Sequence, residues 1–318
     1  MSRPPRGRDP TRELFLRRTC AALGLPESGV LELLSGNLRS SLRVNPLRTP
    51  DREGTLAEVR ALGVELEPIP WCPDAYHLHG EKRRVVESPL FQDGRVFLQN
   101  AASFVPPVVL GPQAGERILD VCAAPGGKSA HIAAMVGNDA ELWLNDALRA
   151  DKLTEVTGLL GVKSASITAH PGQHLDKFLT GAFDRILLDA QCGGEGMLDL
   201  GHAQALRYWS MERVEKYHHM QVSMLRAAWR LLRPGGVLVY STCTFAPEED
   251  EAPVATHLRH HADAAIEPID LPIPGRRPAV LSWEGKKFPP ELRGALRLAP
   301  SEWFEGFFVC RLRKSAVG

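Results

Sequence analysis

Short apolar runs of strand length alternate with helical stretches from about residue 95 onward, and this alternation most constrains the fold. Signals such as LLRPGG end the helical stretches. Strands that alternate with helices build parallel β–α–β units. The expected strands cover residues 116–124, 140–146, 164–168, 183–190 and 235–243, and the expected helices cover 127–136, 148–160 and 210–232. We therefore expect an α/β fold with an open parallel sheet in the strand order 3-2-1-4-5, followed by a late edge strand at 306–314.

The chain before residue 95 has a different texture. Residues 11–90 combine a helical start with short mixed segments that are rich in turn formers, such as VNPLRTPDREG and PIPWCPDAY. We expect a disordered arm at residues 1–10, a small α+β domain at 11–94 and the larger α/β domain, which carries the active site, at 95–318.

Composition excludes several classes of protein. Of the 318 residues, 44% are hydrophobic and 24% are charged, which is typical of a soluble globular protein. No apolar run approaches the length of a membrane span, and no apolar core follows the N-terminal arginines, so we expect neither a membrane protein nor a secretory signal. The six cysteines show no CxxC pair and no metal-ligand spacing. We therefore expect no metal site, no disulfide framework and a cytoplasmic location.

Charge is zero overall but unevenly distributed. Residues 1–60 contain 11 arginines against seven acidic residues. Arg39, Arg43 and Arg48 are therefore candidates for contacts with nucleic-acid phosphates. The alternatives are a solvated surface and, for any one of them, a buried structural role. A second basic group comprises Arg276, Arg277, Lys286, Lys287, Arg293 and Arg297.

The segment DVCAAPGGKSA joins the first expected strand to the first helix of the larger domain. In an open α/β sheet, ligands bind beyond the carboxyl ends of the strands. A phosphate-binding P-loop would need a glycine at Cys122, and the dinucleotide pattern G-x-G-x-x-G is absent. A shorter glycine loop suits a cofactor without a pyrophosphate, of which S-adenosylmethionine is the obvious example. Asp146 follows the loop by about 20 residues, where an acid can accept hydrogen bonds from ribose hydroxyls.

Two cysteines follow neighbouring strands of the expected sheet. Cys192 lies three residues after Asp189, and Cys243 ends the strand at 235–243. Two unrelated core cysteines are the simpler interpretation, but both thiols are expected at the ligand-binding edge. Methylation of C5 in cytosine is one reaction that needs two thiols and a carboxyl group. A thiolate that adds to C6 of cytosine makes C5 nucleophilic. An acid stabilises the charge on the ring, and a base then removes the C5 proton. Cys243, Asp189 and Cys192 could fill these three roles.

Several long motifs in this order resemble the RsmF-type branch of the RNA 5-methylcytosine methyltransferases, the Fmu/Sun family. The resemblance covers residues from about 40 to 314. Its motifs are LRVNPLR, PIPWCPDAY, FLQNAAS, DVCAAPGGKSA, LLDAQCGGEGM, YSTCTFAPEEDE and GFFVCRLRK.

The resemblance implies a Rossmann-like, S-adenosylmethionine-dependent methyltransferase domain behind a small RNA-recognition-like domain that binds RNA. It implies that Cys243 is the nucleophile, that Cys192 releases the product and that Asp189 is the catalytic aspartate. Asp146 is implied to bind the ribose, and we assign Lys128 and Asp189 to both the catalytic and the cofactor-binding sets. The remaining cofactor-binding residues implied by the glycine loop are Cys122, Ala123, Ala124, Pro125, Gly126 and Gly127.

The sequence departs from the family pattern in four places. Gln191 and Gly193 stand where the family usually has proline and serine, so Cys192 is expected to be held less firmly. Pro171 stands where an acid near the adenine is expected, and the loop between Asp146 and Arg149 is two residues short. The chain also stops where family members often carry a further RNA-binding domain.

The expected function is methylation of cytosine C5 in RNA by a monomer, with small-subunit rRNA as the expected substrate and tRNA as the alternative. A degenerate methyltransferase that binds RNA as a ribosome assembly factor is the rival interpretation. A methyltransferase that acts on a protein or a small molecule is a third, but it leaves the paired thiols without a role.

Overall fold

The large sheet has the strand order that the sequence predicts. The computed structural model describes residues 9–36, 38–163 and 165–316. Five neighbouring strands pair in parallel in the order β7-β6-β5-β8-β9, which is 3-2-1-4-5 in chain order. The fold class and this topology are therefore confirmed. These strands are β5 (Glu116–Asp120), β6 (Ala140–Asn145), β7 (Ala165–Thr168), β8 (Phe183–Asp189) and β9 (Leu232–Thr242).

The last strand of the chain lies inside the sheet, so the prediction of an edge strand is wrong. β15 (Phe307–Lys314) runs antiparallel to β9. Its other side pairs with β14 (Leu296–Leu298) and then with β10 (Ala264–Glu267). β11 (Arg276–Arg277) extends the sheet beyond β14. The added strands are two to four residues long, too short to leave an alternating pattern in the sequence.

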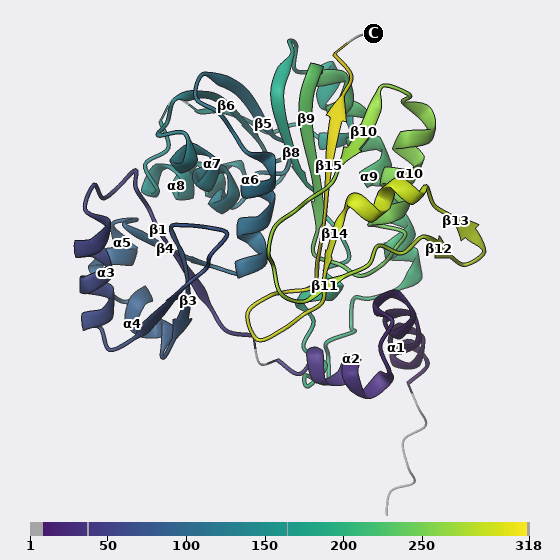
Figure 1. Cartoon of the computed structure of the whole chain (residues 1–318), viewed down its shortest axis with the longest axis horizontal. Coiled ribbons are helices and arrows are strands. Elements are labelled where there is room, and N and C mark those ends of the chain that lie inside the picture. The colour runs from purple at the N-terminus through teal and green to yellow at the C-terminus, as the bar shows by residue number, and fades with distance from the viewer. Residues whose placement is uncertain (1–8, 37, 164, 317–318) are drawn as a thin grey trace, which may run out of the picture.

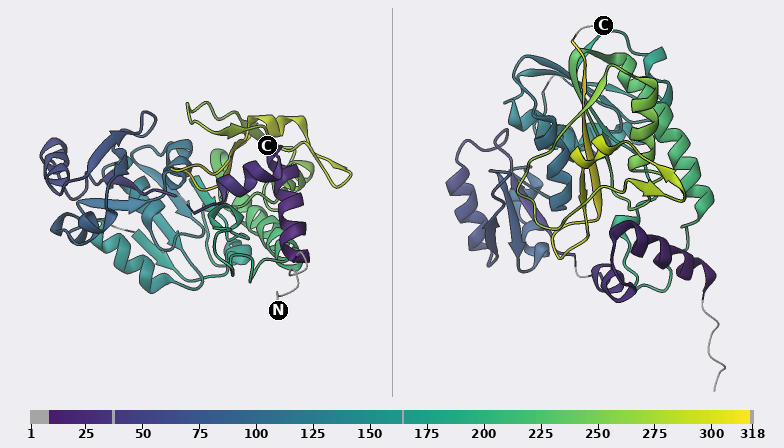
Figure 2. Two further views of the ribbon diagram at one scale, coloured as in Figure 1. Left: turned by 90° about the horizontal axis from the view of Figure 1, so that it is seen from below. Right: turned by 45° about the vertical axis from the view of Figure 1, so that its right-hand side comes forward.

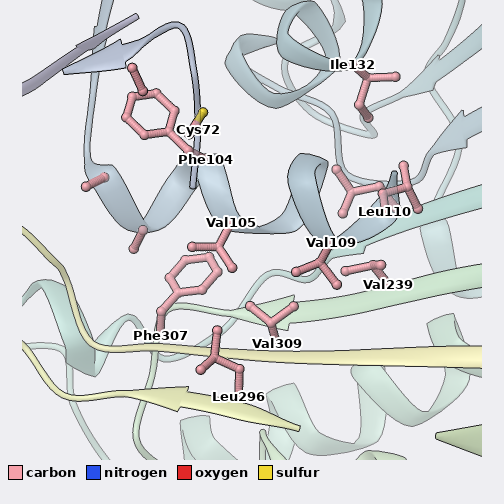
Figure 3. Close-up of a cluster of buried hydrophobic side chains, with 14 of the residues drawn as sticks. Cys72, Phe104, Val105, Val109, Leu110, Ile132, Val239, Leu296, Phe307 and Val309 are labelled. Atoms are coloured by element: carbon pink, nitrogen blue, oxygen red, sulfur yellow. The ribbon is translucent and has the colours of Figure 1, made fainter. Parts of the chain in front are cut away.

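Helices cover both faces of the large sheet (Figure 1). On one face lie α6 (Val105–Leu110), α7 (Gly127–Met135) and α8 (Ala150–Leu159). On the other lie α9 (Met211–Leu231) and α10 (Glu251–His260). Successive strand side chains point to opposite faces, so Leu187 of β8 packs on the first face while Ile186 and Leu188 pack on the second. Figure 3 shows the first face, where Val105 and Val109 of α6 lie over Val239 and Val309.

A separate four-stranded antiparallel sheet forms the small domain, at the lower left of Figure 1. β4 extends this sheet although it lies beyond the expected boundary at residue 94, because it pairs with β1 over its whole length. The strands are β1 (Ser41–Val44), β2 (Glu65–Pro68), β3 (Ala75–His79) and β4 (Val96–Gln99), and the helices are α3 (Arg52–Ala61), α4 (Lys82–Val86) and α5 (Pro89–Gln92).

The first two helices pack elsewhere. α1 (Pro10–Leu23) and α2 (Glu27–Leu33) lie apart from the small sheet (Figures 1 and 2). They bury Phe15 and Val30 against Trp209 and Phe245 of the large domain. The two helices therefore contact the large domain, and the division of the chain into residues 11–94 and 95–318 stays a prediction. Of the expected arm, residues 1–8 lie outside the described residues, while Asp9 caps α1 and Pro10 is its first residue.

The remaining elements are short. A two-stranded hairpin consists of β12 (Ser282–Trp283) and β13 (Lys286–Lys287). Short 3-10 helices occupy Ala101–Phe104, Gly172–Lys177, Glu195–Met197 and Pro290–Gly294. Within the described ranges, no helix has both the length and the apolar character needed to cross a membrane.

Candidate active site

The carboxyl ends of β5, β8 and β9 bring the predicted polar residues together. Asp189 is the last residue of β8. Its Oδ2 atom lies 2.7 Å from Nζ of Lys128, which comes from the glycine loop after β5. Its Oδ1 atom accepts a 2.7 Å hydrogen bond from the Ser241 hydroxyl of β9. Residues at three strand ends therefore fix this carboxylate. Its side chain is still partly exposed, so a ligand can reach it.

The two thiols lie side by side, as the topology predicts. The Sγ atoms of Cys192 and Cys243 are 3.3 Å apart, and the backbone N–H of Cys243 points at Sγ of Cys192 across 3.4 Å. The hydrogen bond with Cys243 and burial together raise the pKa of Cys192 well above its usual value. Cys192 is therefore a protonated thiol, and the Cys243 sulfur lies beside it within hydrogen-bond distance.

Lys128 is the cation of this cluster. Burial alone would lower its pKa, but the charge of Asp189, the hydrogen bond to it and the nearby Cys243 together raise that pKa. Its Nζ also lies 5.8 Å from the centre of the Phe307 ring. The ammonium group therefore stays charged near both the carboxylate and the Cys243 sulfur.

A cavity of about 190 Å³ lies beside the glycine loop. The four-stranded sheet supplies one wall, through Phe97, Leu98 and Gln99 of β4. Gly127 permits this approach, because a Cβ atom there would lie 2.8 Å from the Phe97 ring. Gly126 turns the chain with a φ of +116°, a conformation that suits glycine. The rest of the lining consists of Ser103, Asp120, Cys122, Ala123, Ala124, Pro125, Gly127, Lys128 and Asp189.

Asp120 shows that this cavity suits a cationic ligand. Its Oδ2 atom accepts a 2.7 Å hydrogen bond from Ser129, whereas its buried Oδ1 atom has no partner in the described part of the chain. Burial raises the pKa of Asp120 to about 7. S-adenosylmethionine carries an ammonium and a sulfonium group, either of which could meet this oxygen, so the residues present fit the cofactor. The motif analysis missed Asp120, although its place at the end of the first strand could have identified it.

Asp146 holds the glycine loop in place. Its Oδ1 atom accepts hydrogen bonds from the backbone N–H groups of Leu148 and Arg149, and its Oδ2 atom accepts one from Ala124. The side chain is buried and is not among the cavity residues given above. Oδ2 retains a second lone pair, so binding of a ribose hydroxyl stays a prediction.

Two of the arginines that were candidates for phosphate contacts are buried, so that prediction is wrong for them. Arg43 of β1 is fully buried beside Cys72, and its guanidinium nitrogens have no partner among the described residues. Burial lowers its pKa to about 10. Arg297 of β14 is also buried, where Nη2 pairs with Asp250 at 2.9 Å and with Glu251 at 2.6 Å.

Other basic residues remain at the surface. Arg48 is exposed but bonds to the carbonyl oxygens of Leu159 and Gly158 at the end of α8, so it joins the small sheet to the large domain. Arg39 and Lys82 are exposed and line two adjoining hollows of about 330 and 430 Å³. The first hollow reaches Glu305. Arg276, Lys286, Lys287 and Arg293 are also exposed.

Glu305 is a second acid that the sequence analysis missed. It is half-buried just before β15, and burial raises its pKa while Lys128 lowers it. Its backbone N–H donates to Oδ1 of Asn100. Nothing in the motif around it marks an acid that faces the site, because its placement depends on the internal position of β15.

Comparison with known proteins identifies the family. Residues 107–313 match the family described as 16S rRNA methyltransferase RsmB/F, and residues 12–101 match the N-terminal domain of 16S rRNA methyltransferase RsmF. The chain is 37% identical over 284 residues to the tRNA (cytosine(49)-C(5))-methyltransferase of Pyrococcus abyssi, with 87% of this chain and 88% of that protein covered.

Two further relatives agree. The ribosomal RNA small subunit methyltransferase F of Serratia proteamaculans is 36% identical over 285 residues, which cover 87% of this chain but 57% of that protein. A solved structure of a methyltransferase homologue from Pyrococcus horikoshii superposes with a TM-score of 0.83 at 29% identity, and 95% of each chain is covered. With its matched domains and its Rossmann-like fold, the chain belongs to the RsmB/RsmF family of S-adenosylmethionine-dependent RNA methyltransferases.

Proposed function

We propose that this protein methylates C5 of a cytosine in RNA through a covalent bond between Cys243 and the base. One observation carries the proposal: the sulfur atoms of Cys192 and Cys243 lie 3.3 Å apart beside the Lys128–Asp189 ion pair. C5 and C6 of a pyrimidine are adjacent atoms, so two sulfurs at this spacing suit one group that attacks C6 and another that acts at C5.

Cys243 is the nucleophile of the proposed reaction. Its thiolate adds to C6, and the ring electrons move toward C5 and N3. The Lys128 ammonium group lies near the Cys243 sulfur. Asp189, held by Lys128 and Ser241, presents its carboxyl group to N3 and the exocyclic amine of the ring.

Cys192 is the base that completes the reaction. Its pKa depends on Cys243, so Cys192 can act as a base only after Cys243 has reacted. The largest cause of its raised pKa is the hydrogen bond with Cys243. Once the Cys243 sulfur is bonded to C6, that sulfur no longer carries a charge or a proton, and the pKa of Cys192 falls. Cys192 then releases its own proton to solvent, and the thiolate that results takes the C5 proton while the electrons of that C–H bond expel the Cys243 sulfur as a thiolate.

The cavity beside the glycine loop would hold the cofactor. S-adenosylmethionine, when bound there, supplies the methyl group. Asp120 would meet a positive group of the cofactor, Phe97 and Gln99 would enclose it, and Asp146 would fix the loop and reach the ribose.

RNA would approach across the small domain. Arg39 and Lys82 line the hollows that lead toward Glu305, which itself lies near Lys128 and Asp189. Two exposed cations along one path could follow a phosphate backbone. We expect the protein to act as a monomer, because one chain supplies every residue of the proposed site. We also expect it to act in the cytoplasm.

Small-subunit rRNA is the proposed substrate, since both matched family descriptions name 16S rRNA methyltransferases. tRNA is the second candidate, because the Pyrococcus abyssi relative, at 37% identity, is a tRNA methyltransferase. Bisulfite sequencing of total RNA from cells with and without this protein distinguishes the two. If cells without the protein lose one protected cytosine in 16S rRNA, the rRNA proposal is supported. If they lose one in tRNA instead, tRNA is the substrate.

The covalent adduct tests the reaction itself. Cys192→Ala should accumulate a protein–RNA adduct on denaturing gels in the presence of S-adenosylmethionine, because attack proceeds and release does not. The double variant Cys192→Ala/Cys243→Ala should form none. If Cys192→Ala binds RNA but forms no adduct and transfers no methyl group, and the wild type is also inactive, the protein is an RNA-binding assembly factor instead of an enzyme.

A further inference from the structure

Cys192 stands between two residues that do little to fix their own backbone. Gln191 has no conformational restriction of its own, and Gly193 has the freedom of a residue without a Cβ atom. Both flanking peptide groups are nevertheless held from outside the loop. Nε2 of Gln221 donates to the carbonyl oxygen of Gln191 across 2.9 Å. The N–H of Gly193 donates to Oε2 of Glu249 across 2.8 Å.

These two side chains form one unit, because Nε2 of Gln221 also donates to Oε2 of Glu249 across 3.0 Å. Gln221 comes from α9 and Glu249 from the segment after Cys243. Each is fully buried. We call this pair the Gln221–Glu249 clamp. It holds the chain on both sides of Cys192 from two different parts of the molecule.

Gly193 is what allows the clamp to close on the loop. A Cβ atom at residue 193 would lie 2.7 Å from Oε1 of Glu249, closer than a carbon and an oxygen can approach without a shift. Glu249 cannot easily move away, since its other oxygen holds two hydrogen bonds. Gly193 therefore gives the loop its backbone freedom and also leaves room for Glu249 to bond to that loop.

The clamp is uncharged at neutral pH. Burial raises the pKa of Glu249 to about 9. Its carboxyl group then carries a proton and acts through hydrogen bonds. A buried N–H or C=O group that loses its partner is costly, so the two bonded peptide groups resist displacement.

We propose that Gln221 and Glu249 are positioning residues that hold Cys192 at C5 of the base for the release step. The inference rests on the proposed function. Cys243 does not depend on the clamp in the same way, because Thr242 immediately before it is paired in the sheet with Phe308 of β15. Loss of the clamp should therefore slow release and spare attack.

The test compares the two steps in the same variants. Gln221→Leu and Glu249→Leu should form the methylated adduct in a single turnover at nearly the wild-type rate. Their multiple-turnover rate should fall by ~10- to 100-fold, the scale expected when a reacting group is displaced by about 1 Å. The adduct should then accumulate on denaturing gels, as in Cys192→Ala. Glu249→Gln should keep most of the turnover, because its amide oxygen still accepts both hydrogen bonds.

Glu248→Gln is the matched control. Glu248 is the preceding residue but bonds to Arg18 at 2.7 Å and to Trp283 at 2.9 Å, away from the loop. This variant should turn over as the wild type does. Wild-type turnover in both leucine variants would overturn the proposal. An equal loss of adduct formation and of turnover would also overturn it, because that result indicates general damage to the site. A Glu249→Gln variant as slow as Glu249→Leu would overturn it too, because that result indicates that the carboxyl proton itself is needed.

Gly193→Ala covers the case in which the leucine variants do not fold. The added methyl group should push the Glu249 carboxyl group away without removing it, and should produce the same accumulation of adduct. Wild-type turnover in Gly193→Ala would count against the clamp. Failure of the proposed methylation reaction can be distinguished from failure of the clamp proposal, because Cys192→Ala would then form no adduct at all.

Discussion

The carboxyl edge of the large sheet and the middle of the small sheet both carry charged side chains, with opposite consequences. At the edge, Lys128 and Asp189 pair with each other but stay partly open to a ligand. In the small sheet, Arg43 is an interior strand residue that is fully buried, near Cys72 of its own domain and His131 of α7. In these two regions, the ion pair at the strand ends stays partly accessible, whereas the arginine within a strand is enclosed.

The largest expected effect tests the open edge. Cys243→Ala should reduce methyl transfer by at least ~10³-fold, because no other group beside the base can replace the nucleophile. The melting temperature should stay within a few degrees of the wild-type value, since the thiol is only partly buried. Transfer of labelled methyl groups and circular dichroism measure the two quantities. Turnover close to wild type would remove Cys243 from the reaction.

The next effect tests the enclosed charges. Arg297→Leu should lower the free energy of unfolding by about 3–5 kcal/mol, because it leaves Asp250 and Glu251 buried without their cation. Arg276→Ala, an exposed change in the neighbouring strand, should cost less than about 0.5 kcal/mol. Urea unfolding followed by fluorescence compares them. Equal stabilities would mean that burial of Arg297 contributes nothing to the fold.

Asp120 lies between these extremes, because it is buried yet faces the cavity. Its pKa of about 7 lies above the usual value of an aspartate. The folded apoprotein therefore holds a proton that the unfolded chain releases, and the contribution of Asp120 to stability falls as pH rises toward 7.

Cofactor affinity should change in the opposite direction. As pH rises through about 7, Asp120 ionises and should bind a cationic ligand more tightly. Asp120→Asn should abolish this pH dependence and weaken binding at about pH 8 by roughly 10- to 100-fold, the scale of one charge-assisted hydrogen bond. Calorimetry across this pH range measures both. A pH-dependent affinity that persists in Asp120→Asn would assign the titration to another group.

The smallest effect concerns the exposed cations of the small domain. Arg39→Ala and Lys82→Ala should each make the slope of log affinity for RNA against log salt shallower by about 0.7–0.9, the value for one phosphate contact. Neither should change the melting temperature or cofactor binding, because both side chains are exposed. Arg48→Ala is the informative contrast, since Arg48 is tied to carbonyl oxygens of α8. It should lower stability and leave the slope unchanged.

The sequence predicted the parts of the molecule that local pattern determines. The order of the five parallel strands follows from their alternation with helices, and the meeting of Cys192 with Cys243 follows from that order. The internal position of β15 could not be predicted, because it depends on pairing with β14 and β10, which are too short to show a pattern.

Long-range packing hid the other features. Arg43 looks like any surface arginine until the contact between the domains is known, and the approach of Glu249 to Gly193 joins residues 56 positions apart. The loop around Cys192 looked unrestrained for the same reason. Its restraints come from Gln221 and Glu249, and nothing in the residues adjacent to Cys192 indicates them.

The cofactor cavity has a consequence for how the protein responds to its ligand. One wall belongs to β4 of the small sheet and the opposite wall to the glycine loop of the large one. A ligand bound there touches both and is lost if either unfolds, so its binding energy adds to the stability of the two together. The small sheet is therefore more than a carrier of RNA contacts. A fragment that begins after residue 101 would keep every proposed catalytic side chain and still lack the wall that Phe97, Leu98 and Gln99 supply. Exchange of this sheet between relatives would alter cofactor affinity along with any RNA preference.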